Sequence, residues 1–165
     1  MASKLRVDSI MPVDGVTTTG GGGITQITMG RTNNRTENTS TSFNATNLEA
    51  TITPKFSTSK IYIQVSGDAN TNQGSGSETI FLTVYRSIDG GGFSNLGHST
   101  YGFTQIRNDS SRTHAPVCIN YLDNPGTTAA VVYKVYMRSS GGSSVEFPAD
   151  ANQNYSYMHL LEVSA

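Results

Sequence analysis

The stretch "AAVVYKVYMRSS", residues 129–140, predicts an extended strand more clearly than any other part of the chain. Val and Tyr dominate it, and β-branched and aromatic side chains favour the pleated backbone of a β-strand. "DNPGTT" precedes the stretch and "GGSS" follows it, and both are rich in the residues that form turns. We therefore predict a β-strand between two turns.

The same signature recurs along the chain at short and regular spacing. In residues 59–67, Ile61, Ile63 and Val65 alternate with polar side chains, which predicts a half-buried strand. No window longer than about ten residues has the helical period. The pattern predicts an all-β fold, an antiparallel β-sandwich that is jelly-roll-like. We expect its strands at residues 24–30, 48–54, 59–67, 79–87, 99–106, 113–122, 129–140, 145–148 and 154–163, with residues 31–47 as a loop or irregular edge.

Composition supports this architecture. Ser, Thr, Asn and Gly make up 71 of the 165 residues, and only 14% of the residues are charged. This mixture is typical of short strands joined by many turns, and the length suggests a single core. A net charge of −1 gives no electrostatic attraction to nucleic acid or to an anionic membrane, so neither partner is expected. The chain has no apolar run long enough to span a bilayer and no classical signal at its start, so we expect synthesis in a cytoplasm.

The patterns that would indicate catalysis or cofactor binding are weak. The glycines at 20–23 lack the Lys-Ser/Thr of a phosphate loop and are better explained as a linker. His98, His114 and His159 show no metal-ligand spacing, and Cys118 is interpreted as a small buried hydrophobe. No pair of carboxylates can be assigned to glycoside hydrolysis. We therefore expect no enzyme, no cofactor and no metal.

Two predicted strands carry large side chains on both faces. Phe81, Thr83 and Tyr85 share one such face, and Val132, Lys134 and Tyr136 share another. Either Tyr and Thr simply lie outside, where β-propensity favours them, or these faces meet a neighbouring subunit. In the second case the candidate interface residues are Phe81, Tyr85 and Tyr136, and Phe81→Asp is expected to break the oligomer more than the fold.

The stretch "HSTYGFTQIRNDSSR", residues 98–112, is a candidate binding patch. Tyr101 and Phe103 are expected to share a strand face, and a polar loop follows them. A ring that stacks on a sugar, beside groups that bind its hydroxyls, suits glycan recognition. The alternative, which we favour, is a buried aromatic pair with an ordinary polar turn. The candidate receptor or glycan contacts are Tyr101, Phe103, Arg107, Asn108, Asp109 and Arg112.

The N-terminal stretch "SKLRVDSIMPVDGVTTTGGGG" is apolar at intervals and ends in a Thr/Gly run. Leu5, Val7, Ile10 and Val13 would expose apolar groups that a monomer does not cover. Packed against other copies or another protein, they would gain about 25 cal/mol for each Å² buried. We therefore predict that residues 1–23 form an extended attachment arm with a linker, and that residues 24–165 form the head.

This opening, together with "ATITPKFSTSKIYIQVSG", "NYLDNPGTTAAVVYKVYMRS" and the terminal "HLLEV", resembles small virion proteins of tailed bacteriophages, above all tail-fibre and related appendage proteins. The resemblance covers about half the chain. It implies a homotrimer with a β-sandwich head, joined to other phage virion proteins through the arm. Residues 67–77 and 88–111 match no such motif, and receptor specificity would lie there.

The resemblance therefore implies a non-enzymatic virion structural protein. It would be a short tail fibre or tail-associated protein that contacts the host surface, through a cell-surface glycan or protein. The alternatives are a capsid decoration or cement protein of similar trimeric build, and a free carbohydrate-binding, lectin-like module. The first two place the protein on the phage tail or the capsid surface.

Overall fold

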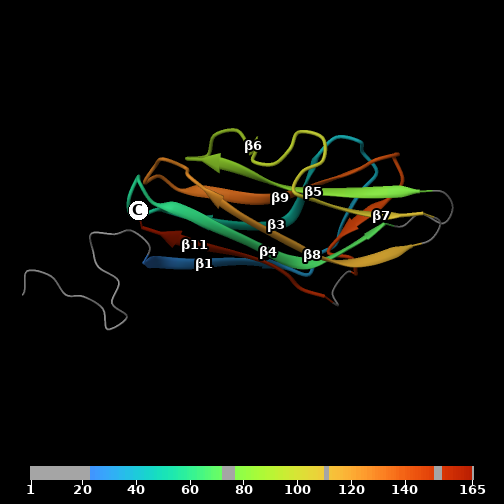
Figure 1. Cartoon of the computed structure of the whole chain (residues 1–165), viewed down its shortest axis with the longest axis horizontal. Helices are drawn as coiled ribbons and strands as arrows, with labels where there is room; N and C mark the ends of the chain where they lie inside the picture. Colours follow the sequence, from blue (N-terminus) through green and yellow to red (C-terminus); the bar gives the residue numbers. More distant parts are fainter. Residues whose placement is uncertain (1–22, 72–76, 110–111, 151–153, 165) are drawn as a thin grey trace, which may run out of the picture.

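The computed structural model describes residues 23–71, 77–109, 112–150 and 154–164. Within them the chain forms two antiparallel sheets packed face to face, which confirms the predicted all-β sandwich. Figure 1 shows the sheets as two layers, one containing β5, β9 and β3 and the other β1, β11, β4 and β8. The arm residues Leu5, Val7, Ile10 and Val13 lie outside the described residues.

Sheet A has the strand order β1–β11–β4, with β8 paired to the other edge of β4. Two short strands, β10 and β2, continue the sheet beyond the end of β11, and β10 pairs with β4. The bounds are β1 (Ile24–Thr32), β2 (Thr36–Asn38), β4 (Lys60–Thr71), β8 (Thr113–Asp123), β10 (Val145–Phe147) and β11 (Ser156–Val163).

Sheet B has the order β3–β9–β5, and the short strands β6 and β7 both pair with the far edge of β5. Its bounds are β3 (Asn44–Ile52), β5 (Glu78–Ile88), β6 (Ser94–Asn95), β7 (Thr104–Asn108) and β9 (Val131–Ser139). The eight longer strands form two sheets of four, β1–β11–β4–β8 and β3–β9–β5–β7, and each connection between them crosses to the other layer except that from β5 to β7, which pair within sheet B. This is the arrangement of a jelly roll.

The core lies between the layers and follows the alternation read from the sequence. Ile61, Ile63 and Val65 of β4 are fully buried, as predicted, and they face alternate residues of β9 such as Tyr133 and Val135. The period of two therefore places one face of each central strand in the core. β8 is an edge strand, one of the few places in a sheet where a proline such as Pro116 is tolerated.

A polar clamp joins the two sheets at one end of the sandwich. Arg86 of β5 donates to both carboxylate oxygens of Asp123 on β8, at 2.9 and 3.0 Å. The buried hydroxyl of Tyr133 on β9 donates to Asp123 at 2.7 Å. Burial, followed by the hydrogen bond to Asp123, raises the pKa of Tyr133, so this hydroxyl stays protonated and keeps donating.

Two predicted segments differ from the structure. The predicted strand at 99–106 is wrong in its first half, because Gly102 adopts φ +64° and pairs with His98 in a tight turn, so β7 begins only at Thr104. The predicted loop at 31–47 contains β2 and the start of β3. Its polar side chains are used inside the fold, since the buried Asn38 donates to the carbonyl of Met137 at 2.8 Å.

Candidate functional site

The aromatic pair of the predicted glycan patch is split by the turn at Gly102. Tyr101 is 58% exposed and stacks on His98 with ring centres 5.0 Å apart. Phe103 instead packs beneath, against Tyr121 of sheet A. The two residues therefore do not share a strand face, and the expectation that they do is wrong.

The polar residues of the same patch have local structural partners. Arg107 forms an exposed ion pair with Asp109 at 3.1 Å. Asn108 is buried, and its side-chain oxygen accepts from the backbone amide of Glu78 at 2.7 Å. Arg112 reaches away to Asp150, at 3.2 Å. Among the described residues no recorded contact joins these side chains to Tyr101 or Phe103, so the structure does not assemble the six into one site.

The candidate interface residues Phe81, Tyr85 and Tyr136 lie together on the outer face of sheet B. Tyr85 and Tyr136 stack with their ring centres 3.9 Å apart. The segment around β6 arches over this side of the sheet (Figure 1) and brings Phe93 to within 5.9 Å of Tyr136, between ring centres. Side chains of the same chain therefore cover much of this face.

Phe81 in particular is only 6% exposed. Its ring lies 4.2 Å from the guanidinium carbon of Arg138 and 5.9 Å from the ring of Tyr101. Arg138 also donates to the carbonyl of Thr100 at 2.8 Å, which holds the covering segment in place. Phe81→Asp would thus disturb packing within one chain, and the folded head gives no reason to expect a selective effect on the oligomer. A subunit contact through Tyr85 and Tyr136 stays a prediction.

A shallow hollow of about 410 Å³ adjoins this cluster. It holds Arg138, whose donors already serve the carbonyls of Thr100, Thr41 and Ser139. Its other lining side chains are small or aromatic, and none is a carboxylate or histidine. It therefore offers no acid–base pair. The lining consists of Thr41, Ser42, Phe43, Tyr85, Ser99, Thr100 and Arg138.

The titratable groups of the described residues are dispersed. No three His, Cys, Asp or Glu side chains among them gather in a way that would hold a metal ion. Cys118 is exposed, so its interpretation as a buried hydrophobe is wrong: it lies on the outer face of β8 between the inward Val117 and Ile119. Within the described residues no helix is long and apolar enough to cross a membrane.

The buried carboxylates have partners that explain them structurally. Glu146 pairs with Arg35 at 3.0 Å, and Glu162 accepts from the backbone amide of Lys55 at 2.7 Å. Burial acts to raise the pKa of Glu78, but hydrogen bonds from the Ser140 hydroxyl and from backbone amides outweigh it and lower that pKa to about 2. Ion pairs and hydrogen bonds within the fold already hold these carboxylates, so they are poor candidates for proton transfer.

The feature that does stand out is the outer face of sheet A. The register places Ile27 of β1 opposite Leu161 of β11, Leu161 opposite Tyr62 of β4, and Tyr62 opposite Leu122 of β8. These four side chains form one row across all four strands, here called the apolar row. Ile27 is 60% exposed and Leu122 49% exposed, while Leu161 and Tyr62 are half-buried.

The surroundings of the apolar row are partly apolar and partly polar, with Lys60 opposite Val163. Met29, 52% exposed, lies next to it on the same face of β1, and Val163 follows Leu161 on β11. The next row across the sheet is Met29, His159, Gln64 and Asn120, which contains no carboxylate. Scattered apolar residues on a surface are normal, whereas neighbouring exposed apolar side chains form a candidate interaction surface. The sequence placed Tyr62 outward, yet only the register of four strands reveals the row.

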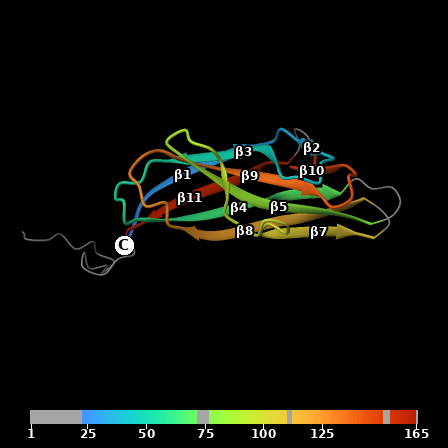
Figure 2. The same cartoon turned by 90° about the horizontal axis from the view of Figure 1, so that it is seen from above.

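Figure 2 shows the sandwich from above, with the chain ends of the head close together. The backbone amide of Ser164 donates to the carbonyl of Gly23 at 3.0 Å, beside the first residues of β1. The first described residue of the head, Gly23, therefore lies at the edge of sheet A, at the start of the strand that carries Ile27. No protein-family model matches this chain, and no curated protein matches it significantly.

Proposed function

We propose that the chain is a non-enzymatic structural protein of a tailed-bacteriophage virion, a short tail fibre or tail-associated protein whose heads associate as a homotrimer through the outer face of sheet A. The observation that carries the assembly is the apolar row. The virion assignment rests on the resemblance of the chain's ends and central strands to phage appendage proteins.

A second copy of the chain is the occupant that best fits this face. The row consists of Ile27, Leu161, Leu122 and the ring of Tyr62 and carries no charge, so rows of several copies can pack together without matching charges. Closed rotational symmetry lets three identical faces cover one another around an axis. Each Å² of apolar surface removed from water contributes about 25 cal/mol. Trimerisation would therefore stabilise the head by hiding side chains that the isolated chain leaves in water.

The position of the chain ends supports an attached arm. Gly23 lies at the start of the edge strand that carries Ile27 and Met29. In a trimer built on sheet A, three arms would leave from neighbouring points near the axis. That geometry suits joint insertion into another virion protein. A capsid decoration protein would use the same geometry, and localisation of the protein in particles distinguishes the two.

Charge substitutions in the apolar row test this assembly. Ile27→Lys and Leu122→Lys replace side chains that are about half exposed in the single chain, so we expect the fold to survive. In the trimer each change forces an unpaired charge into an apolar contact, which costs several kcal/mol. We expect both variants to sediment as monomers with unchanged circular dichroism.

Tyr101→Lys is the control, because Tyr101 is similarly exposed, at 58%, but lies in the turn that covers the outer face of sheet B. We expect it to sediment like the wild type. If both sheet A variants keep the wild-type sedimentation coefficient, the apolar row is not the subunit interface and the proposed assembly is wrong.

A further inference from the structure

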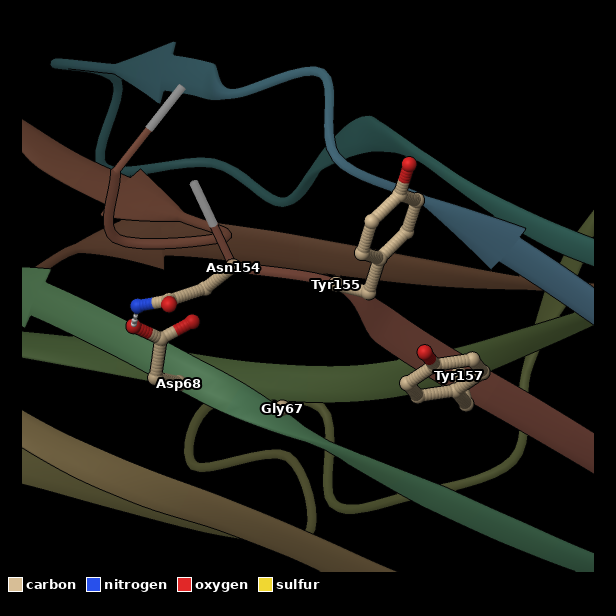
Figure 3. Close-up of a pocket in the computed structure, with 5 residues that line it drawn as sticks. All are labelled: Gly67, Asp68, Asn154, Tyr155 and Tyr157. Atoms are coloured by element: carbon tan, nitrogen blue, oxygen red, sulfur yellow. Dashed lines mark hydrogen bonds between the residues drawn. The ribbon is translucent and has the colours of Figure 1, made fainter. Parts of the chain in front are cut away.

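A second hollow, of about 370 Å³, lies on the outer side of sheet A at the far end of β4 and β11 from the apolar row. Figure 3 shows its lining side chains, with Asp68 and Asn154 on one side and the rings of Tyr155 and Tyr157 on the other. Gly67 contributes backbone between them. The hollow is open to solvent, and polar groups face aromatic ones across it.

Asp68 is the charged group of this hollow. Its carboxylate accepts from the side-chain amide of Asn154 at 2.8 Å and, more weakly, from the backbone amide of Ala149 at 3.4 Å. A carboxylate has about four acceptor positions, so these two bonds leave others open. Within the described part of the chain no Lys, Arg or His forms an ion pair with Asp68. The hollow therefore presents a negative acceptor that is oriented but not neutralised.

The opposite wall is aromatic. Tyr155 is 45% exposed, and its ring centre lies 6.2 Å from that of Tyr157. The guanidinium of Arg31 lies 5.3 Å from the centre of the Tyr155 ring, so it supports this exposed ring. Neither tyrosine hydroxyl has a recorded hydrogen-bond partner among the described residues. Two aromatic rings, one of which carries Arg31 on one face, and two tyrosine hydroxyls thus border the carboxylate.

We infer that this hollow binds a neutral pyranose sugar. The apolar face of such a ring stacks on a tyrosine, while Asp68 accepts hydrogen bonds from its hydroxyls. Asn154 and the tyrosine hydroxyls are placed to complete the polar contacts. The uncompensated charge of Asp68 disfavours sugars that carry a carboxylate or sulfate. This inference names the class of host ligand that the protein would contact, and it therefore rests on the proposed function.

The hollow and the proposed interface are compatible. Tyr157 precedes Leu161 by four residues on β11, which separates the hollow from the apolar row by about 13 Å along the strand. In a trimer that packs through the apolar row, the hollow therefore lies away from the subunit contact, where β11 begins. The sequence pointed to a different patch for glycans, because Asp68 and Tyr155 are far apart in the chain and only the pairing of β4 with β11 brings them together.

The test uses the full-length protein and four probes: the methyl glycosides of galactose, glucose and mannose, and methyl glucuronide as the charged counterpart of glucose. Saturation-transfer NMR detects contact, and titration gives the Kd. We expect at least one neutral glycoside to bind in the millimolar range and more tightly than the glucuronide. Tyr155→Ala and Asp68→Asn should each raise that Kd by about tenfold or more.

Matched controls are available for both variants. Tyr101→Ala removes an exposed tyrosine from the turn that covers sheet B, and Asp109→Asn neutralises a highly exposed aspartate. Both should bind the glycoside like the wild type, and thermal melting shows whether each variant is folded. Since Asp68→Asn is nearly isosteric, it keeps the test valid even if Tyr155→Ala unfolds.

The inference is overturned if no neutral glycoside binds, if the glucuronide binds more tightly, or if the control variants lose as much affinity as the hollow variants. The mass of each sample is measured in parallel, so a failure of sugar binding can be told apart from a failure of trimer assembly. A trimer that binds no sugar contradicts only the inference. A monomer that binds sugar in the hollow contradicts only the assembly.

Discussion

Glu78 shows how a single buried side chain organises a turn of this protein. Its carboxylate, at the start of β5, accepts from the backbone amide and hydroxyl of Ser140, both at 2.7 Å. It also accepts from the amides of Thr79, Gly141 and Ser143. The carboxylate thus satisfies backbone groups of the segment that follows β9. A buried carboxylate with this many donors is stabilised in its ionised form.

Glu78→Gln tests this role through its pH dependence. The folded pKa of about 2 lies below the ordinary value of 4.5, so ionisation stabilises the fold above about pH 4.5, and this stabilisation is lost as the pH falls toward 2. The shift corresponds to about 3 kcal/mol. Urea denaturation at pH 7 should show the variant destabilised by about 2–3 kcal/mol, and the difference should shrink between pH 4.5 and 2.

Glu49→Gln is the matched control for this experiment. Its carboxylate is about half exposed and pairs with Lys134 at 2.8 Å, and an exposed pair of this kind contributes at most about 1 kcal/mol. If the difference in free energy of unfolding between the wild type and Glu78→Gln stays constant from pH 7 to pH 2, the account of Glu78 is wrong.

At the scale of elements, β1 depends on a close approach to β3 in the other sheet. A Cβ atom added at Gly30 would overlap the backbone carbonyl of Glu49 and contact the Cβ of Ala50. The glycine therefore lets the edge strand that carries Ile27 and Met29 lie directly over β3. Without this contact, the outer strand of the apolar row would shift.

Gly30→Ala should destabilise the fold by about 1–3 kcal/mol, because the backbone of β3 has to move to make room. The measurement is the free energy of unfolding in urea. Gly92→Ala is the control: an added Cβ there meets nothing within 4 Å, so no comparable loss is expected. Equal stability of the Gly30→Ala variant and the wild type would show that β1 does not need this close approach.

The elements also show what the sequence predicts and where it fails. Alternation located β4 and assigned its inward face correctly, because burial of one strand face imposes a period of two, whereas β9 was predicted from its Val and Tyr content. It failed at 99–106, where Gly102 bends an apolar stretch into a turn. It also placed Cys118 in the core, since composition alone does not say which face of an apolar edge strand points inward.

At the scale of the whole molecule, the surfaces that matter are built from residues far apart in the sequence. The apolar row joins four strands, and the hollow lined by Asp68 and Tyr155 joins β4 to the segment before β11. Strand propensities give neither the pairing partners nor the register, so neither surface was predicted from the sequence. The predicted glycan patch was instead continuous in sequence, and the fold directs its side chains to separate structural contacts.

The account of the molecule as an assembling head rests on the apolar row, and the native mass of the full-length protein tests it most directly. Light scattering or native mass spectrometry should give about 53 kDa, three times the 17.6 kDa of one chain. Such a trimer would account for the exposed Ile27, Leu122 and Met29. A monomer of 17.6 kDa that persists at high protein concentration would contradict the account.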